Sequence, residues 1–227
     1  FLFMEKYSSQ KWHFRKKRIG DTMVEPKSLE KFDDAPRGVN KEAALSFFVT
    51  GESYQNDLDA SLKNNKPVKC KIDIKEYENN DKFLKYFDDV KKHTIIKNND
   101  KQSDYQCEPK IFNQKKIKSL IISDYNTTGI TGDVELMQPV LSNGEPNNWF
   151  GFFHSLGKSV KKNESGTGGS EGEGRQVFAY SSLISTFFVY SVDHNTNKHK
   201  FMGMSYLGSH WEYENEYLPL AKFGKIK

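Results

Sequence analysis

The chain has 227 residues and a formal net charge of +4, from 34 basic and 30 acidic residues, a balance that does not by itself indicate nucleic acid as the ligand. Its content of 36% hydrophobic residues, including 17 Phe and 11 Tyr, is enough for one large domain or two small ones. Two cysteines with no C-x-x-C partner argue against a structural zinc site and favour reduced thiols in a cytoplasmic protein. No apolar run reaches the roughly 18 residues of a membrane span, so we expect no membrane partner.

The N-terminal residues 1–39 are predicted to form an arm with a strand, and residues 40–227 to form one folded domain. Within the arm, "KWHFRKKRIG" is basic and contains two aromatic residues. A solvated strand or terminal arm is the favoured interpretation of residues 11–18. Contact with nucleic acid is the alternative.

The remaining elements alternate between helices and strands, and the strands gather toward the C-terminus. In chain order we expect a helix between the turn cluster 34–40 and the stop signal 64–67, a strand at 68–77, a helix at 81–93, a strand at 116–124, a helix at 147–156, a loop at 157–174, a helix at 175–184, and strands at 185–192 and 200–208. This mixture predicts an α/β (α+β) two-layer sandwich, in which helices cover one face of a mixed sheet.

The first helix raises a question about burial. Its stretch "LSFFV" at 45–49 places apolar side chains on one arc, and steps of three and four residues extend that arc onto Glu52, Asn56 and Asp59. Burying three unpaired polar groups would cost about 1–3 kcal/mol each. Either these residues form a polar site, or the helix runs out of the core into solvent.

Two further segments suggest which site this is. "ISDYNTTGITGD" (122–133) contains the end of a strand that we expect to be buried; the strand closes with an acid and opens into a turn with glycines. "GGSEGEGR" (168–175) is a Gly-rich loop that leads into a helix. Such a loop offers backbone N–H groups to phosphates. A carboxylate at a strand end can accept a hydrogen bond from the amine of adenine, and an Asn oxygen suits Mg²⁺. Together the three segments predict ATP binding.

In their order and spacing these segments resemble the GHKL ATPases, which include DNA gyrase, the ninety-kilodalton heat-shock chaperone, sensor histidine kinases and the MutL proteins. "ESYQNDLDA" (52–60) matches the E-x-x-x-N-x-x-D-A motif of that family at every fixed position. "GSEGEG" (169–174) matches G-x-x-G-x-G, while "DYNTTGITG" spreads the glycines of D-x-G-x-G. The resemblance covers roughly residues 40 to 190 and is closest to bacterial stand-alone histidine-kinase-like ATPase domains, some of them linked to phage defence.

The resemblance implies roles for the first two motifs. Glu52 would be the general base that activates water, and Asn56 would coordinate Mg²⁺. Asp59 would support the adenine pocket through water, Asp124 would bind the adenine amino group, and Gly129 would let the chain pass under the base.

The third motif would be a lid over the nucleotide, at 157–174. Gly172 and Gly174 would lie against the phosphates, and Gly169 would likewise lack a side chain that blocks close approach. Lys158 or Arg175 would balance phosphate charge. Glu171 and Glu173 depart from the family pattern, because carboxylates near a triphosphate are repelled by it.

The function expected from the resemblance is slow, Mg²⁺-dependent ATP hydrolysis that works as a conformational switch within a larger bacterial protein. A further domain, a partner protein or a second copy of the chain would then complete the site. Two alternatives stay open. One is a non-catalytic nucleotide sensor or interaction module, and the other is an ATPase associated with nucleic acid through residues 11–18. Turnover by the purified protein separates the first alternative from an ATPase.

Overall fold

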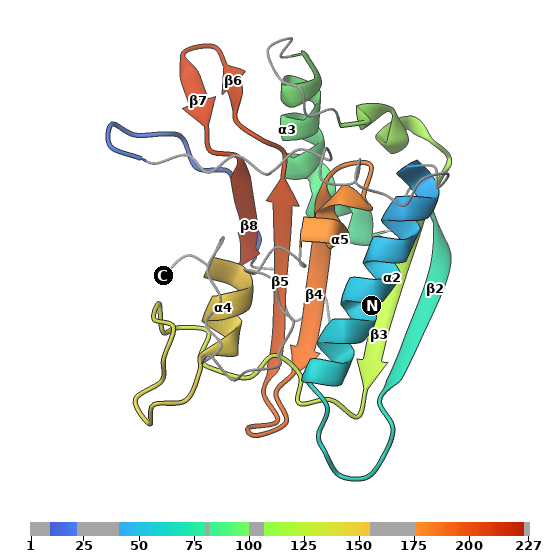
Figure 1. Cartoon of the computed structure of the whole chain (residues 1–227). Coiled ribbons are helices and arrows are strands. Elements are labelled where there is room, and N and C mark those ends of the chain that lie inside the picture. Colours follow the sequence, from blue (N-terminus) through green and yellow to red (C-terminus); the bar gives the residue numbers. More distant parts are fainter. Residues whose placement is uncertain (1–9, 22–40, 80–81, 100–106, 155–175, 225–227) are drawn as a thin grey trace.

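The computed structural model describes residues 10–21, 41–79, 82–99, 107–154 and 176–224. Figure 1 shows the elements, which in chain order are β1 (Lys11–His13), α2 (Lys41–Asp59), β2 (Lys69–Glu78), the 3₁₀ helix η2 (Lys82–Phe87), α3 (Asp88–Asn99), the 3₁₀ helix η3 (Pro109–Asn113), β3 (Lys116–Tyr125), α4 (Asn148–His154), α5 (Gln176–Tyr180), β4 (Thr186–Val192), β5 (His199–Tyr206), β6 (His210–Glu212), β7 (Asn215–Tyr217) and β8 (Leu220–Gly224).

The strands form three separate sheets within the described residues. The central sheet has the order β1-β8-β5-β4, β2 pairs with β3 in a long two-stranded ribbon, and β6 pairs with β7 in a short hairpin. Every one of these ladders is antiparallel. The α+β class is therefore confirmed, whereas the prediction of one mixed sheet is wrong.

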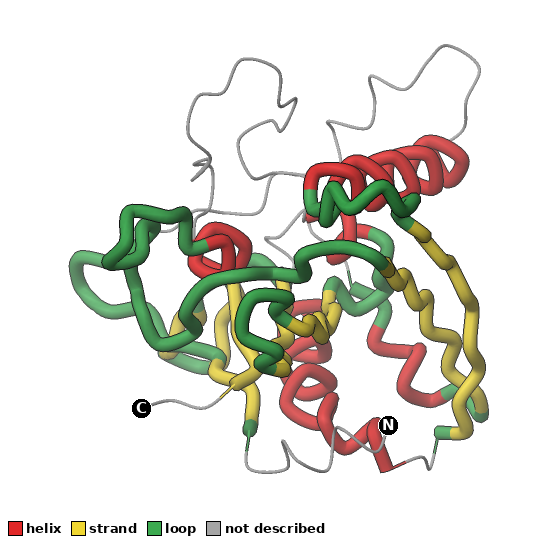
Figure 2. The backbone as a smooth tube through the Cα atoms, turned by 90° about the horizontal axis from the view of Figure 1, so that it is seen from below, coloured by secondary structure: helices red, strands yellow, loops and turns green. Residues whose placement is uncertain are grey.

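The central sheet has a core on each of its two faces. Phe201 of β5 and Phe223 of β8 pack with Trp12 of β1 and Val90 of α3. On the opposite face a second cluster joins β5 to α4 and α5, and contains Trp149, Phe153, Ala179, Met204 and Tyr206. Figure 2 shows helices on both sides of the strands. Because successive strand residues point to opposite faces, β5 is buried on both. The predicted two-layer sandwich with one covered face is therefore wrong.

The sequence located most of the strands and helices on which this arrangement rests. The predicted elements at 68–77, 116–124, 147–156, 185–192 and 200–208 correspond to β2, β3, α4, β4 and β5. The predicted helix at 81–93 is instead η2 followed by α3, which continues to Asn99, and the predicted helix at 175–184 is the five-residue α5. The 3₁₀ helix η3 and the three C-terminal strands β6, β7 and β8 were not predicted from the sequence.

No helix in the described ranges combines the length and the apolar character needed to cross a lipid bilayer.

A pair of buried histidines joins α3 to the β6–β7 hairpin. The Nδ1 atom of His93 lies 2.8 Å from Nε2 of His210, and Nδ1 of His210 lies 2.9 Å from the carbonyl oxygen of Gly208. His210 therefore donates to Gly208 and accepts from His93, and the Phe14 ring stacks on His93 at 3.7 Å. Burial, with smaller contributions from His210 and Lys92, lowers the pKa of His93 to about 4.

Stability should therefore fall with acidity in one defined window. Below pH 6.5 His93 is protonated in the unfolded chain, whereas in the folded chain it stays neutral down to about pH 4. Unfolding is therefore coupled to proton uptake in this range, and lowering the pH destabilises the folded state. We expect His93 to account for a loss of about 2 kcal/mol between about pH 7.5 and about pH 5. Urea unfolding at the two pH values measures it. His93→Gln should reduce this pH dependence and the exposed His194→Gln should not, whereas equal dependence in all three proteins would contradict the assignment.

Candidate functional site

Helix α2 has three faces, and the motif residues occupy only one of them. Its buried face runs through Val49, Ser53 and Asp57, which are each less than a tenth exposed. One step around the helix, Glu52 is half-buried and Asn56 is exposed. A third face carries the exposed apolar residues Phe47, Tyr54 and Leu58. The helix face that carries Glu52 and Asn56 therefore lies beside the buried face and toward solvent. It does not continue the buried face that runs through Val49.

The C-terminal end of α2 is bonded to the loop that follows β3. The backbone N–H of Thr128 donates to the carbonyl oxygen of Ala60 at 2.7 Å, and that of Leu62 donates to Asn126 at 3.3 Å. Asp59 lies exposed in the last turn of the helix and accepts a hydrogen bond from the Gln55 amide at 3.0 Å. The first and second motifs, which are about 70 residues apart in the chain, therefore meet in space.

Asp124 lies at this junction, near the end of β3. The prediction that it closes a buried strand is wrong, because Asp124 is exposed and no residue of β3 is fully buried. Its carboxylate accepts a hydrogen bond from the hydroxyl of Thr127, which fixes the side chain at the strand end. Across the ribbon, Asp124 is paired with Cys70 of β2.

Asp57 is a site residue that the sequence analysis missed. It is 7% exposed, its side chain is hydrogen-bonded to Cys70, and its Oδ2 atom has no hydrogen-bond partner. Burial raises the pKa of Asp57, and the nearby Asp124 carboxylate adds to that rise. Burial and Asp57 also raise the pKa of the Cys70 thiol to about 11. Its spacing of four and eight residues from Ser53 and Val49 is the signal that could have revealed it.

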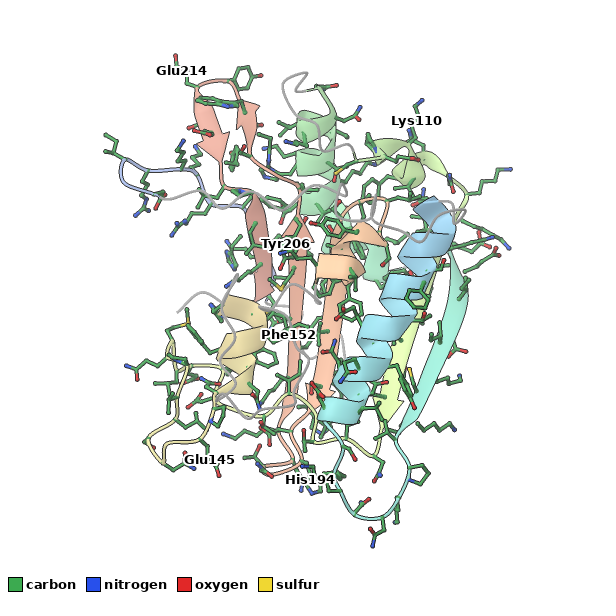
Figure 3. All side chains as sticks on the ribbon, viewed as in Figure 1. Lys110, Glu145, Phe152, His194, Tyr206 and Glu214 are labelled. Atoms are coloured by element: carbon green, nitrogen blue, oxygen red, sulfur yellow. The ribbon has the colours of Figure 1, made fainter. Side chains whose placement is uncertain are left out.

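Two glycines of the loop are required by close backbone approach. Gly129 has a φ of +63°, and a Cβ there would lie 2.1 Å from the carbonyl oxygen of Val192. Gly132 has a φ of +114°, and a Cβ would lie 2.2 Å from Oδ1 of Asn147. The loop thus lies directly on the β4–β5 turn, where the backbone N–H of His194 (labelled in Figure 3) donates to Thr128 at 3.0 Å.

A buried ion pair between Lys200 and Asp193 contacts the same glycine-containing loop. The ammonium of Lys200 donates to Asp193 at 2.7 Å and to the carbonyl oxygens of Ile130 and Gly132 at 2.8 and 2.7 Å. Asp193 also accepts from the backbone N–H of Gly132 at 3.2 Å. Burial acts to raise the pKa of Asp193, but Lys200 and the backbone donors of its own turn outweigh it, so that this pKa is lowered.

Asn147 organises the next part of the loop. Its side chain is fully buried, and its amide nitrogen donates to the carbonyl oxygens of Asp133, Leu136 and Gln138 at 3.0–3.2 Å. Its Oδ1 atom accepts from the backbone N–H of Phe150 at 3.3 Å, at the start of α4. One side chain therefore sets both the path of residues 133–138 and the start of α4.

The third motif lies outside the described residues, with Lys158, Gly169, Gly172, Gly174 and Arg175. The element that follows it, α5, is described and packs against α2 (Figure 1). The first described residues after the predicted lid therefore lie next to α2, the helix that carries the first motif.

The basic segment 11–18 forms part of the fold. Trp12 is buried in the core, and β1 pairs with β8. The backbone N–H of Lys17 donates to Glu216 at 2.7 Å, and its ammonium forms a salt bridge with the carboxylate of the same residue at 2.8 Å. Arg15 forms a salt bridge with Asp21 at 3.1 Å. The segment is therefore anchored in the fold through Trp12, while the side chains of Lys11, Lys16 and Arg18 are exposed.

Among the described residues, no three His, Cys, Asp or Glu side chains are placed so that they could hold a metal ion. Comparisons of this chain with protein-family models, with curated proteins and with solved structures found no match.

Replacing Gly129 by Ala should destabilise the protein strongly. An L-residue at positive φ costs about 1–2 kcal/mol, and the new Cβ would collide with the backbone of Val192. Overpacking of this kind adds about 1–3 kcal/mol. Gly144→Ala is the matched control, because Gly144 has a φ of +82° but open space around it. Urea unfolding should show a clearly larger loss of unfolding free energy for Gly129→Ala. Equal losses would mean that the loop does not lie against Val192.

Proposed function

We propose that this chain binds Mg²⁺-ATP between α2, the loop 124–133 and the segment before α5, and hydrolyses it slowly as a GHKL-type conformational switch. The observation that carries the proposal is the contact between the first two motif regions, together with the position of the helix that follows the third motif. The end of α2 is hydrogen-bonded to the loop after Asp124, and α5 packs on α2. The first and third regions match the family motifs at every fixed position, and the second keeps its acid and two glycines at wider spacing. A chance match would not be expected to bring the first two regions together.

Asp124 has the chemistry required of an adenine-binding residue. A carboxylate has about four lone-pair sites, so a hydrogen bond from Thr127 leaves acceptor capacity for an exocyclic amine. The side chain is exposed at a strand end, which makes it accessible to a base entering beside the loop. The contacts that hold this loop through Gly129 and Lys200 support a site of defined geometry for the base.

Glu52 and Asn56 suit the phosphate end of the nucleotide. They lie one turn apart on the same helix face, with Glu52 half-buried and Asn56 exposed. Mg²⁺ usually takes few ligands from protein and the rest from phosphates and water, so one amide oxygen is a sufficient contribution. When bound, the ion would neutralise charge that develops on the phosphates. Glu52 would polarise the attacking water.

Asp124→Asn should weaken ATP binding while leaving the fold intact. Loss of a charge-assisted hydrogen bond costs about 1.5–3 kcal/mol, which is about 10- to 150-fold in the dissociation constant. Isothermal titration with a non-hydrolysable ATP analogue and Mg²⁺ measures this change. Asp89→Asn, an exposed acid of α3, should bind like the parent. If the parent protein does not bind the analogue, or if Asp124→Asn binds equally well, the proposed site is wrong.

Glu52→Ala should keep nucleotide affinity and lose hydrolysis, whereas Asn56→Ala should weaken binding only when Mg²⁺ is present. A general base contributes about 10²–10⁴-fold to rate, so steady-state phosphate release should fall by that factor in Glu52→Ala. The parent rate should itself lie below the common enzyme range of about 1–10³ s⁻¹. A parent protein that binds ATP with no turnover would instead be a nucleotide sensor, and unchanged turnover in Glu52→Ala would remove the base assignment.

A further inference from the structure

The β6–β7 hairpin presents two exposed aromatic rings. Trp211 of β6 is 51% exposed, and Tyr213, in the two-residue turn between the strands, is 94% exposed. The other two tryptophans of the chain are buried, with Trp12 5% and Trp149 4% exposed. Tryptophan is highly buried on average in folded proteins, so an exposed one beside an exposed tyrosine marks a candidate contact surface.

Tyr213 holds an unfavourable backbone conformation. Its φ is +55°, in the left-handed region. Two-residue hairpin turns favour Gly, Asn or Asp at such a position, and a bulky L-residue there costs free energy. Because the side chain is almost fully exposed, packing within the fold does not offset this cost. Strain at an unpacked aromatic residue points to a contact with another molecule.

The opposite face of the hairpin is fixed to the fold. His210 is fully buried and lies against His93 of α3, as described above. Tyr217 is 7% exposed, and its hydroxyl donates to the carboxylate of Glu212 at 3.0 Å. Because successive residues of a strand point to opposite faces, the burial of His210 turns Trp211 outward.

A run of four cations lies alongside the hairpin. Residues 15–18 have the sequence RKKR. Lys16 forms a β-bridge with β7, and the backbone N–H of Lys17 donates to the carbonyl oxygen of Glu216 at 2.7 Å. Glu216 is also paired with Trp211 across the hairpin, so the side chains of Lys17 and Trp211 lie on the same face. In Figure 1 the N-terminal segment lies beside the hairpin at one end of the molecule.

Two cations of this run are not neutralised. Lys16 and Arg18 are exposed, and neither forms a salt bridge within the part of the chain that the structure describes. The acids near the rings are for the most part already paired with cations, namely Glu216 with Lys17 at 2.8 Å, Asp21 with Arg15 at 3.1 Å and Glu212 with Lys92 at 3.0 Å. Glu214, labelled in Figure 3, is exposed at the tip of the hairpin.

We propose that the Trp211 surface, which comprises Trp211, Tyr213 and residues 15–18, binds single-stranded nucleic acid. Bases stack on the two rings, and phosphates lie along the basic run. Stacking tolerates any base sequence because every base has a π-face, and exposed Lys and Arg side chains attract phosphates. The surface is separate from the nucleotide site proposed above and does not depend on it.

Two other anionic partners fit the surface less well. A duplex keeps the faces of its bases stacked on one another, so the rings cannot reach them. An anionic lipid surface that takes up Tyr213 would have to accept the carboxylate of Glu214 with it. A flexible single strand can stack on the rings while its phosphates stay on the side of residues 15–18.

Fluorescence anisotropy on the whole chain tests the proposal, with labelled oligo(dT) and oligo(rU) of about 16 nucleotides. Both should bind, and more tightly than a duplex of equal length. With two to four phosphates contacted, binding should weaken about 7- to 50-fold between about 50 and about 200 mM salt. The strand should also quench tryptophan fluorescence, because Trp211 is exposed whereas Trp12 and Trp149 are buried.

Three outcomes of this experiment overturn the proposal. The first is the absence of oligonucleotide binding, including the case in which vesicles of phosphatidylserine quench the tryptophan fluorescence instead. The second is duplex binding as tight as single-strand binding. The third is release of the strand by excess Mg²⁺-ATP, which would place the strand in the nucleotide site.

Aromatic variants separate stacking from folding. Trp211→Ala should weaken binding about 5- to 150-fold, and Trp211→Phe should retain most of the affinity. Tyr213→Asn should unfold at a higher urea concentration than the parent, because Asn tolerates positive φ, and yet bind the strand less tightly. Tyr54→Ala, which removes an exposed ring from α2, should bind like the parent. Parental affinity in Trp211→Ala or in Tyr213→Asn overturns the stacking assignment.

A charge variant tests the path of the phosphates. Lys16→Gln combined with Arg18→Gln should reduce the slope of log affinity against log salt by about 1.4, since each phosphate contact contributes about 0.7. The control combines Lys110→Gln with Lys198→Gln, which are exposed lysines elsewhere on the molecule, and should leave the slope unchanged. An unchanged slope in the first variant, or an equal decrease in both, overturns the assigned path.

Discussion

The buried ion pair between Lys200 and Asp193 is the interaction on which the arrangement of the candidate site depends. All three donors of the ammonium are used, one by Asp193 and two by carbonyl oxygens of the glycine loop. The pair gains little net stability, since two ions had to leave water. Its effect is positional, because moving an acceptor away would leave a buried charge without its partner, which is costly. The loop after β3 is therefore fixed to the β4–β5 turn, and the end of α2 is fixed to the loop.

The sequence predicted the local elements well and their assembly less well. Strict alternation identified β2, and apolar runs identified β4 and β5. The nearly continuous apolar character of the run at 200–208 is also typical of a strand that is buried on both faces, as β5 is. β8 was missed because five residues, "LAKFG", give too little pattern, and its place beside β1 depends on pairing across almost the whole chain.

In the candidate site, too, local spacing was predicted better than contacts between distant segments. The spacing of Glu52 and Asn56 placed both correctly on one helix face. Which face of the helix is buried, however, depends on the elements against which the helix packs. The buried face passes through Ser53 and Asp57, each one residue after Glu52 and Asn56, respectively. The exposure of Asp124 and the clamp by Lys200 could not be predicted, since both arise from contacts between distant segments. Asp57 has an oxygen without a hydrogen-bond partner and lies close enough to Asp124 for the two carboxylates to interact. The electrostatics of the junction therefore depend on both carboxylates, of which only Asp124 belongs to the family motifs.

The pairing of β1 with β8 has a consequence for how the protein is made. The ring of His13 contacts the carbonyl oxygen of Gly224, a residue 211 positions later. At an elongation rate of about 5–20 residues per second, β1 leaves the ribosome about 10–40 s before its partner strand exists. During that interval Trp12 has no sheet to pack on, and neither face of the central sheet can be completed. Nascent chains should therefore be more dependent on chaperones than the finished domain, and synthesis that stalls before β8 should leave the core around Trp12 and Phe201 open.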